Sequence, residues 1–255
     1  MHNWRILDEA FLYDGTFLGF ISVVYNIIVN KHFPREIKFE NEYMDNIFND
    51  SVFITTNEES SNKVLYKLKS NNYTYYNVYT SFMSSSETKE MDILKYILKF
   101  IKYGDKINFM KNDSVIITVD KMCKQVKREA HRLKGFIRFK ELNNGVLFVD
   151  ISPENNIIEI LVNHFKERLK NESWIIIDTR RKNAVIYDKG KYELINFVDN
   201  YENDLSKEEE LFQNLWKNYF KTIAIKERKN KRCQMNFMPK KYWKYLVEDV
   251  YDKTD

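Results

Sequence analysis

The stretch Val126-Lys-Arg-Glu-Ala-His-Arg-Leu-Lys-Gly-Phe-Ile-Arg-Phe139 predicts a helix with two faces of opposite character, followed by a strand. At about 100° per residue, one broad face collects Lys124, Lys127, Arg128, His131, Arg132 and Lys134. The opposite face is apolar and comprises Val119, Met122, Cys123, Val126, Ala130 and Leu133. A helix that packs on a core by one face and displays positive charge on the other suits a polyanion such as nucleic acid.

Glycine and turn signals around this helix predict the fold class. Gly135 is expected to end the helix as a left-handed cap. Hairpins are expected at about 136–151, around Asn143-Asn144-Gly145, and at about 174–198. We therefore predict an α+β fold in which several amphipathic helices pack an antiparallel sheet built from hairpins.

Three helices have sequence signals of their own. An apolar helix is expected at Phe17–Asn30, after a turn at Asp14-Gly15. A second is expected to begin at Ser152-Pro153, because proline is favoured in the first turn of a helix. Ser206 with Glu209 three residues later forms a capping box that opens a third.

The chain of 255 residues is expected to form one domain, with a subdivision into an N-terminal α/β part, 1–86, and a basic C-terminal part, 87–255. Its longest apolar stretch, Gly19–Val29, is too short to span a bilayer, and no secretory leader opens it. We expect a cytoplasmic protein without a membrane partner. A disulfide between Cys123 and Cys233 is not expected in that compartment.

Positive charge is concentrated in the second half of the chain. Residues 1–120 carry 13 Lys/Arg against 16 Asp/Glu, whereas residues 121–255 carry 28 against 21. Residues 217–244 hold ten Lys/Arg against the single acid Glu227. A solvated basic surface would explain one such segment, but two that both lie beside aromatic residues favour nucleic acid.

Motifs for cofactors and metals are absent from the sequence. It has no closely spaced Cys/His set, no phosphate-binding loop, no dinucleotide fingerprint and no His-Glu-x-x-His. We therefore expect no cofactor and no metal site.

Three residues are candidates for chemistry. His131 could act as a general base or could bind a phosphate, and the alternative is local pairing. Glu129 could assist it, but an ion pair with Arg132 on the same helix is the favoured role. Asp178 interrupts an apolar run and is either a catalytic carboxylate or the partner of Arg180 or Arg181.

Further residues are candidates for nucleic-acid binding. Cations would engage phosphates, and aromatic faces could stack on unpaired bases unless they pack the C-terminal segment onto the sheet. Beyond the helical cations, the candidates are Arg138, His164, Arg168, Arg181, Arg228, Asn230, Tyr242 and Trp243.

The same motifs resemble a bacterial family known as "probable DNA metabolism protein". The resemblance is carried by Tyr13–Phe20, Val126–Phe139, His164–Arg168, Trp174–Asp178 with Arg181, Leu215-Trp216, Ile225–Asn230 and Met238–Trp243. It covers nearly the whole chain, with only a loose match over 31–110. It implies a DNA-repair context and a radical-SAM DNA modification or repair protein as partner, and some relatives are fused to a uracil-DNA-glycosylase-like domain. It assigns no catalytic residue.

Three functions remain open from the sequence. The first is a DNA-binding protein of DNA repair or base modification, which uses residues 121–140 and 217–245 and acts with the radical-SAM partner. The second is a nucleic-acid-processing enzyme that uses His131 with Glu129 or Asp178. The third is a module that docks the radical-SAM partner through its basic face.

Overall fold

The computed structural model describes residues 4–44, 50–196 and 204–247, and it divides into two compact units. The N-terminal unit is Met1–Lys127 and the C-terminal unit is Arg128–Asp255, so the boundary falls within helix α5, Ser114–Phe136. Helices and strands are both abundant, which confirms the α+β class. Among the described residues, no helix is both long and apolar enough to cross a membrane.

The N-terminal unit packs helices around the apolar helix α1, Phe17–Asn30, whose bounds are those expected from the sequence. Thr16 caps it by accepting a hydrogen bond from the backbone N–H of Gly19. The other elements are β1 Arg5–Ile6, β2 Ala10–Tyr13, β3 His32–Phe33, β4 Glu36–Phe39, η1 Glu40–Glu42, β5 Ser51–Phe53, α2 Glu58–Lys69, α3 Asn72–Phe82, α4 Lys89–Tyr103 and η2 Gly104–Phe109. Strand β2 pairs in parallel with β4 and β5, and β1 pairs in parallel with β3.

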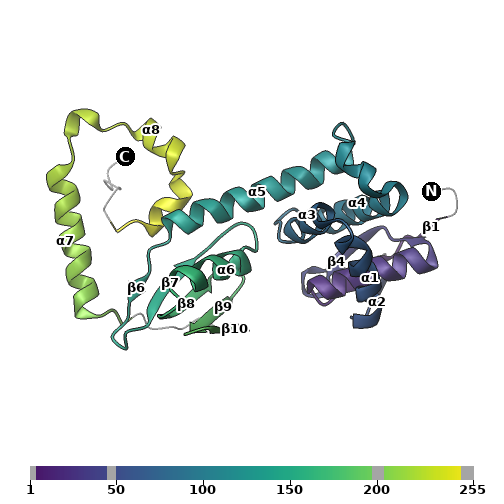
Figure 1. Cartoon of the computed structure of the whole chain (residues 1–255), viewed down its shortest axis with the longest axis horizontal. Coiled ribbons are helices and arrows are strands. Elements are labelled where there is room, and N and C mark those ends of the chain that lie inside the picture. The colour runs from purple at the N-terminus through teal and green to yellow at the C-terminus, as the bar shows by residue number, and fades with distance from the viewer. Residues whose placement is uncertain (1–3, 45–49, 197–203, 248–255) are drawn as a thin grey trace. The chain divides into compact units, whose positions relative to one another are not determined.

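The C-terminal unit is built on a five-stranded sheet in the order β10-β9-β8-β7-β6 (Figure 1). Its elements after α5 are β6 Lys140–Glu141, β7 Leu147–Ile151, α6 Ile158–Arg168, β8 Ser173–Asp178, β9 Asn183–Asp188, β10 Lys191–Asn196, α7 Lys207–Ile223, η3 Lys226–Arg228, α8 Lys231–Phe237 and η4 Lys240–Tyr245. Both expected hairpins are present, with Gly145 at a φ of 77° in the first turn.

The sheet is mixed, whereas hairpins alone predicted an antiparallel one. Strands β7 and β8 pair in parallel, from Leu147 opposite Trp174 to Ile151 opposite Asp178. Helix α6 is the crossover between them, as a parallel pair requires, and it lies across the sheet (Figure 1). The turn signals on either side of α6 predicted the two hairpins correctly. They carry no information on how β7 and β8 pair.

Two expected helix ends were wrong. Helix α5 continues through Gly135 to Phe136, because the N–H of Ile137 still donates to the carbonyl of Leu133 at 2.9 Å. Gly135 therefore has an ordinary helical role and is not a left-handed cap. Helix α6 begins at Ile158, since the backbone N–H groups of Glu154 and Asn155 are bonded to Glu129 instead of opening a helix.

The segment from α7 to η4 leaves the sheet and returns to the C-terminal end of α5 (Figure 1). At its start, the expected capping box is confirmed, since Ser206 Oγ accepts from the N–H of Glu209. The N–H of Ser206 donates to the carbonyl of Glu141, which anchors α7 to β6. At its end, the ring of Tyr242 packs on Phe136 at 5.3 Å between centroids. We call residues 207–247 the C-terminal arm.

Replacing Trp174 by Ala should destabilise the C-terminal unit by about 3–5 kcal/mol. Trp174 is fully buried on β8 and stacks on Tyr187, with 4.7 Å between ring centroids, so its removal leaves a large cavity. Equilibrium unfolding in urea measures the loss. Tyr192→Ala on β10 is the control, because that side chain is exposed and its loss should cost under about 1 kcal/mol. Equal losses in the two variants would contradict this account of the core.

Candidate nucleic-acid interface

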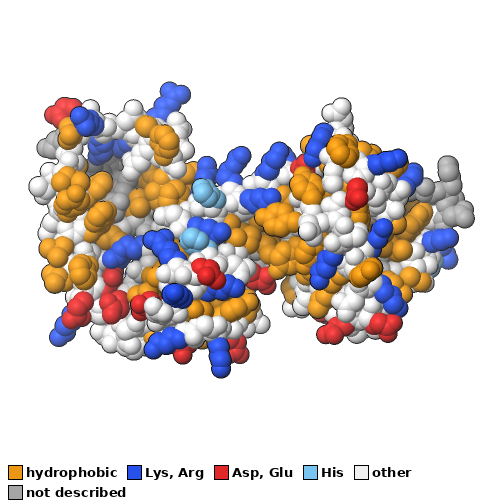
Figure 2. All heavy atoms as spheres, in the orientation of Figure 1, with side chains coloured by type: hydrophobic (Ala, Val, Ile, Leu, Met, Phe, Trp, Pro, Cys, Tyr) orange, Lys and Arg blue, Asp and Glu red, His pale blue; other side chains and the backbone are white. Residues whose placement is uncertain are grey.

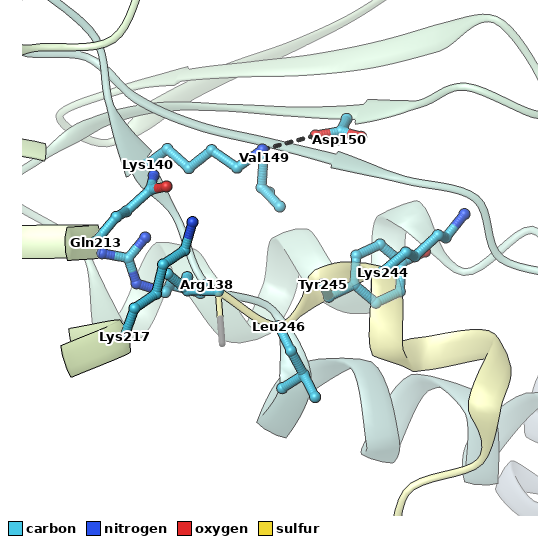
Figure 3. Close-up of a pocket in the computed structure, with 10 residues that line it drawn as sticks. Arg138, Lys140, Val149, Asp150, Gln213, Lys217, Lys244, Tyr245 and Leu246 are labelled. Carbon is cyan, nitrogen blue, oxygen red and sulfur yellow. Dashed lines mark hydrogen bonds and ion pairs between the residues drawn. The ribbon is translucent and has the colours of Figure 1, made fainter. Parts of the chain in front are cut away.

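A basic pocket of about 340 Å³ opens in the C-terminal unit (Figure 3). Three stretches distant in sequence line it, namely the segment after α5 with β7, helix α7, and the end of the C-terminal arm. Its lining residues are Arg138, Lys140, Val149, Asp150, Gln213, Lys217, Lys244, Tyr245, Leu246 and Val247. Four of them are cations and Asp150 is the one acid, so the pocket attracts anions.

Arg138 is held in place by a buried carboxylate of α7. Its two terminal nitrogens donate to the two oxygens of Glu209 at 2.5 and 3.3 Å, and Gln213 donates to the same carboxylate at 2.6 Å. Burial acts to raise the pKa of Glu209, but the hydrogen bonds from Arg138 and Gln213 lower it below its ordinary value. Such a bidentate pair fixes the guanidinium plane at the pocket wall.

The remaining cations are less neutralised. Lys140 lies 3.4 Å from Asp150 and reaches across the pocket, while Arg138, Gln213 and Lys217 lie together on one side and Lys244 and Tyr245 form the other (Figure 3). Lys217 and Lys244 make no ion pair with any carboxylate in the described part of the chain. A phosphate is the anion that such an arrangement of lysine and arginine donors suits best.

A second set of cations extends along α5. In the C-terminal unit, Arg128 and His131 are exposed, and Arg132 and Lys134 are half-buried. Their apolar neighbours Ala130 and Leu133 are buried, which confirms the two-faced helix. Lys124 and Lys127 belong to the N-terminal unit; both are exposed, and the Lys127 amine lies 4.2 Å from the ring centroid of Tyr76.

Glu129 is a structural residue and not a partner of Arg132. Its side chain is 5% exposed and accepts hydrogen bonds from the backbone N–H of Glu154 at 2.9 Å, the N–H of Asn155 at 2.8 Å and the amide of Asn155 at 2.6 Å. Lys241 of the C-terminal arm lies 3.8 Å away and also pairs with Glu154 at 2.9 Å. These hydrogen bonds hold the loop at 152–157 against α5.

Asp178 supports the same loop indirectly, through Arg181. It is completely buried at the end of β8 and accepts from the N–H groups of Arg180 and Arg181 and from the Arg181 guanidinium at 2.9 Å. Arg181 in turn donates to the carbonyls of Pro153 and Glu154, at 3.2 and 2.5 Å. Asp178 is thus paired with Arg181, one of the two partners expected from the sequence, and Arg181 also belongs to the loop network.

The structure does not assemble His131, Glu129 and Asp178 into a catalytic group. No hydrogen bond or ion pair joins His131 to either carboxylate within the described residues. His131 is exposed on the cationic face of α5, whereas both carboxylates are buried against the loop at 152–157. General acid–base catalysis needs groups within hydrogen-bond reach of one another and of a substrate, and this triad offers none.

Arg168 on α6 adds a further exposed cation, and His164 lies on the same helix. The ring of His164 is half-buried against Phe165, at 4.9 Å between centroids. Burial, with the charges of Lys134 and Arg168 as further causes, lowers the pKa of His164 below its ordinary value. It is therefore neutral at pH 7 and can donate one hydrogen bond to a phosphate without adding charge.

The aromatic residues expected to stack on bases are buried instead. Tyr242 is 3% and Trp243 6% exposed, and the Trp243 indole N–H donates to the carbonyl of Met238 at 2.7 Å. Tyr242 packs on Phe136 of α5, whereas the alternative expected from the sequence was packing onto the sheet. Asn230 caps α8 by accepting from the N–H of Cys233, and Arg228 is exposed nearby.

The pocket residues Lys140, Lys217 and Lys244 lie within the expected contact ranges 121–140 and 217–245 but were not named as candidates, and Gln213 lies outside both ranges. Lys217 and Lys244 are the two ends of the cation-dense segment 217–244, which was the available signal. No local pattern shows that the chain between them loops back to the hairpin at 140–151. Among the described residues, no group of His, Cys, Asp or Glu could hold a metal ion.

Comparison with known proteins gives one match. A family model described as a domain of unknown function, DUF4130, matches residues 87–248. No curated protein and no solved structure matches the chain. The matched segment includes all of the pocket residues.

Replacing Glu129 by Gln should destabilise the fold by about 2–4 kcal/mol, because an amide group would face N–H donors that need an acceptor. Urea unfolding measures the change, and Glu167→Gln on the exposed side of α6 is the matched control. If Glu129 acted as a catalytic base, its replacement would leave stability near the wild-type value.

Stability should fall in acid partly through Glu209. Because the folded pKa of Glu209 is lowered, its stabilisation is complete above the unfolded pKa, ordinarily near 4.5, and is lost as the pH drops through the folded pKa. The free energy of unfolding between pH 7 and pH 3 should therefore decrease less in Glu209→Gln than in wild type. Glu210→Gln, an exposed neighbour, should keep the wild-type pH dependence. Parallel curves for all three proteins would argue against the Arg138–Glu209 pair.

Proposed function

The chain belongs to the DUF4130 family, and from that premise we propose that it binds DNA through the cationic surface of its C-terminal unit. The observation that carries the proposal is the basic pocket, in which Arg138, Lys140, Lys217 and Lys244 surround a hollow with Asp150 as its only acidic lining residue. The phosphodiester backbone is the commonest polyanion that such a surface meets, and lysine and arginine supply most of the contacts to it.

The arrangement around the pocket supports a role in binding. Arg138 is oriented before any ligand arrives, since Glu209 and Gln213 hold it. Lys217 and Lys244 make no ion pair with a carboxylate among the described residues, and their charge supports binding of phosphates. Arg128, Arg132 and Lys134 on α5 add further positive charge within the same unit. Contacts of this kind set affinity and register without reading sequence.

The enzyme alternative is weaker, because its two carboxylates are engaged in the loop network. The resemblance to the "probable DNA metabolism protein" family supports DNA over RNA and supports a role in DNA repair or base modification beside a radical-SAM protein. We include that context and that partner in the proposal. If the basic face instead docks the radical-SAM protein directly, the complex of the two proteins should survive nuclease treatment. Added DNA should then displace the radical-SAM protein poorly.

Binding of a fluorescein-labelled duplex should weaken as salt rises from 50 to 200 mM, with a log–log slope of about −0.9 per phosphate neutralised. The double variant Lys217→Gln/Lys244→Gln should reduce the slope by about 2 and weaken binding about tenfold or more at low salt. Fluorescence anisotropy measures both quantities.

Lys170→Gln/Lys191→Gln is the matched control, since it removes the same charge from exposed positions that do not line the pocket. A flat salt response would reject DNA binding altogether. Equal losses in the pocket variant and in this control would reject the pocket as the binding site.

A further inference from the structure

Two of the four cations that line the basic pocket are compensated by carboxylates. Lys140 lies 3.4 Å from Asp150, the acidic residue in the lining. Arg138 donates from both terminal nitrogens to Glu209, which is buried behind the pocket wall. The charge that the pocket offers to a ligand therefore comes mainly from its other two cations.

Lys217 and Lys244 give the pocket two positive charges that no carboxylate among the described residues compensates by an ion pair. An internal phosphodiester of DNA carries one negative charge. A phosphomonoester at the end of a strand carries about −1.5 to −2 at pH 7, because its second pKa is about 6. The charge of the pocket thus matches a terminal phosphate more closely than an internal one.

The shape of the pocket suits a group that enters end-on. Arg138 and Lys217 lie on one side of the hollow, and Lys244 and Tyr245 form the other (Figure 3). Its volume of about 340 Å³ is within the range of sites that take up whole small molecules. An internal phosphate has a sugar on both sides, so it reaches both walls only if the strand bends into the pocket. A terminal phosphate has one neighbouring sugar and enters without that bend.

The pocket also has donors for all the oxygens of such a phosphate. Glu209 occupies only part of the guanidinium of Arg138, which keeps further N–H groups for a ligand. The hydroxyl of Tyr245 accepts from the N–H of Ser152, and burial raises the pKa of Tyr245 to about 12, so the phenol keeps its own proton at pH 7. A phosphomonoester has three terminal oxygens that accept strong hydrogen bonds, and lysine and arginine donors suit them.

Building on the proposed DNA binding, we propose that the basic pocket receives the terminal phosphate of a broken DNA strand, at its 5′ or its 3′ end. The rest of the strand leaves the pocket, and cations of the same unit, such as Arg128 and Arg132, serve its internal phosphates. Lys and Arg side chains project from α5 in Figure 2.

The chemistry of strand breakage identifies the reaction that supplies this ligand. Hydrolysis of a phosphodiester adds water across one P–O bond, which leaves a hydroxyl on one new end and a phosphomonoester on the other. A strand-cleaving reaction therefore converts a monoanionic link into the more highly charged group that the pocket matches. Such an end arises during DNA repair, the context included in the proposed function.

The test uses one short duplex, labelled with fluorescein at one end, in three forms that differ only at the 5′ terminus of the other end. The terminus carries a hydroxyl, a phosphate or a methyl phosphate, and the methyl phosphate has one charge, as an internal phosphate does. Fluorescence anisotropy at fixed salt should show about tenfold tighter binding of the phosphate form than of the hydroxyl form. The methyl phosphate form should gain less than about threefold. A parallel set with the group at the 3′ terminus identifies the end that the pocket takes.

Two double variants link this preference to the pocket. In Lys217→Gln/Lys244→Gln the phosphate and hydroxyl forms should bind within about twofold of each other, because the two uncompensated charges are gone. In Lys170→Gln/Lys191→Gln, which changes exposed lysines outside the pocket, the wild-type preference should remain. Urea unfolding should give both variants the wild-type midpoint, since neither change removes a buried side chain.

Several outcomes would overturn the inference. Equal affinities for the hydroxyl and phosphate forms at both termini would show that the pocket ignores strand ends. Equal gains from phosphate and methyl phosphate would show that it does not distinguish a monoester. A preference that survives in Lys217→Gln/Lys244→Gln would place the terminal phosphate elsewhere. Competition by thymidine 5′-monophosphate as strong as that by the phosphorylated duplex would assign the pocket to a free nucleotide.

The failure of this inference can be told apart from failure of the proposed function. Duplex binding that depends on Lys217 and Lys244, with no response to the terminal phosphate, rejects the strand-end site alone. Absence of binding to every form of the duplex rejects both.

Discussion

The hydrogen bonds to the buried carboxylate of Glu129 are the interaction on which the C-terminal unit most depends. The carboxylate sits on the core side of a helix whose other side is cationic, and it is almost completely excluded from water. A buried carboxylate must be surrounded by donors, because an unpaired charge in a protein interior costs several kcal/mol. The donors come from the loop at 152–157 and from Lys241 of the C-terminal arm. Partial burial acts to lower the pKa of Lys241, but the hydrogen bond to Glu154 raises it above its ordinary value, so this lysine stays charged.

The loop at 152–157 links the main parts of the unit. Arg181, itself held by Asp178 at the end of β8, donates to the carbonyls of Pro153 and Glu154, and the hydroxyl of Tyr245 accepts from the N–H of Ser152 at 2.9 Å. Burial raises the pKa of Tyr245 to about 12, which keeps the phenol neutral. With the loop fixed, α6 can cross from β7 to β8 and the arm can close on α5. Glu129 and Asp178, the two buried carboxylates that were candidates for catalysis, both take part in holding this loop.

After these contacts are made, the surface of the C-terminal unit still carries many cations and several exposed apolar side chains. The cations of α5, the hairpin and the arm remain at the surface, and the closing of the arm gathers four of them around one pocket. Helix α7 is fixed at its start by the capping box and by the Arg138–Glu209 pair.

The sequence by itself determined the local features. The bounds of α1, the capping box at Ser206 and Glu209, the turn at Asn143-Asn144-Gly145 and the two-faced character of α5 are all set by neighbours within a few residues. Only the tertiary structure decided that β7 and β8 run parallel, that α5 continues through Gly135, that Tyr242 and Trp243 are buried, and that Lys140 and Lys217 share a pocket. Apart from the end of α5, these outcomes depend on contacts between segments distant in sequence, such as the pairing of β7 with β8, the packing of Tyr242 on Phe136 and the Arg138–Glu209 pair. Such contacts leave no periodicity or spacing in the chain, because the partners meet only after it has folded.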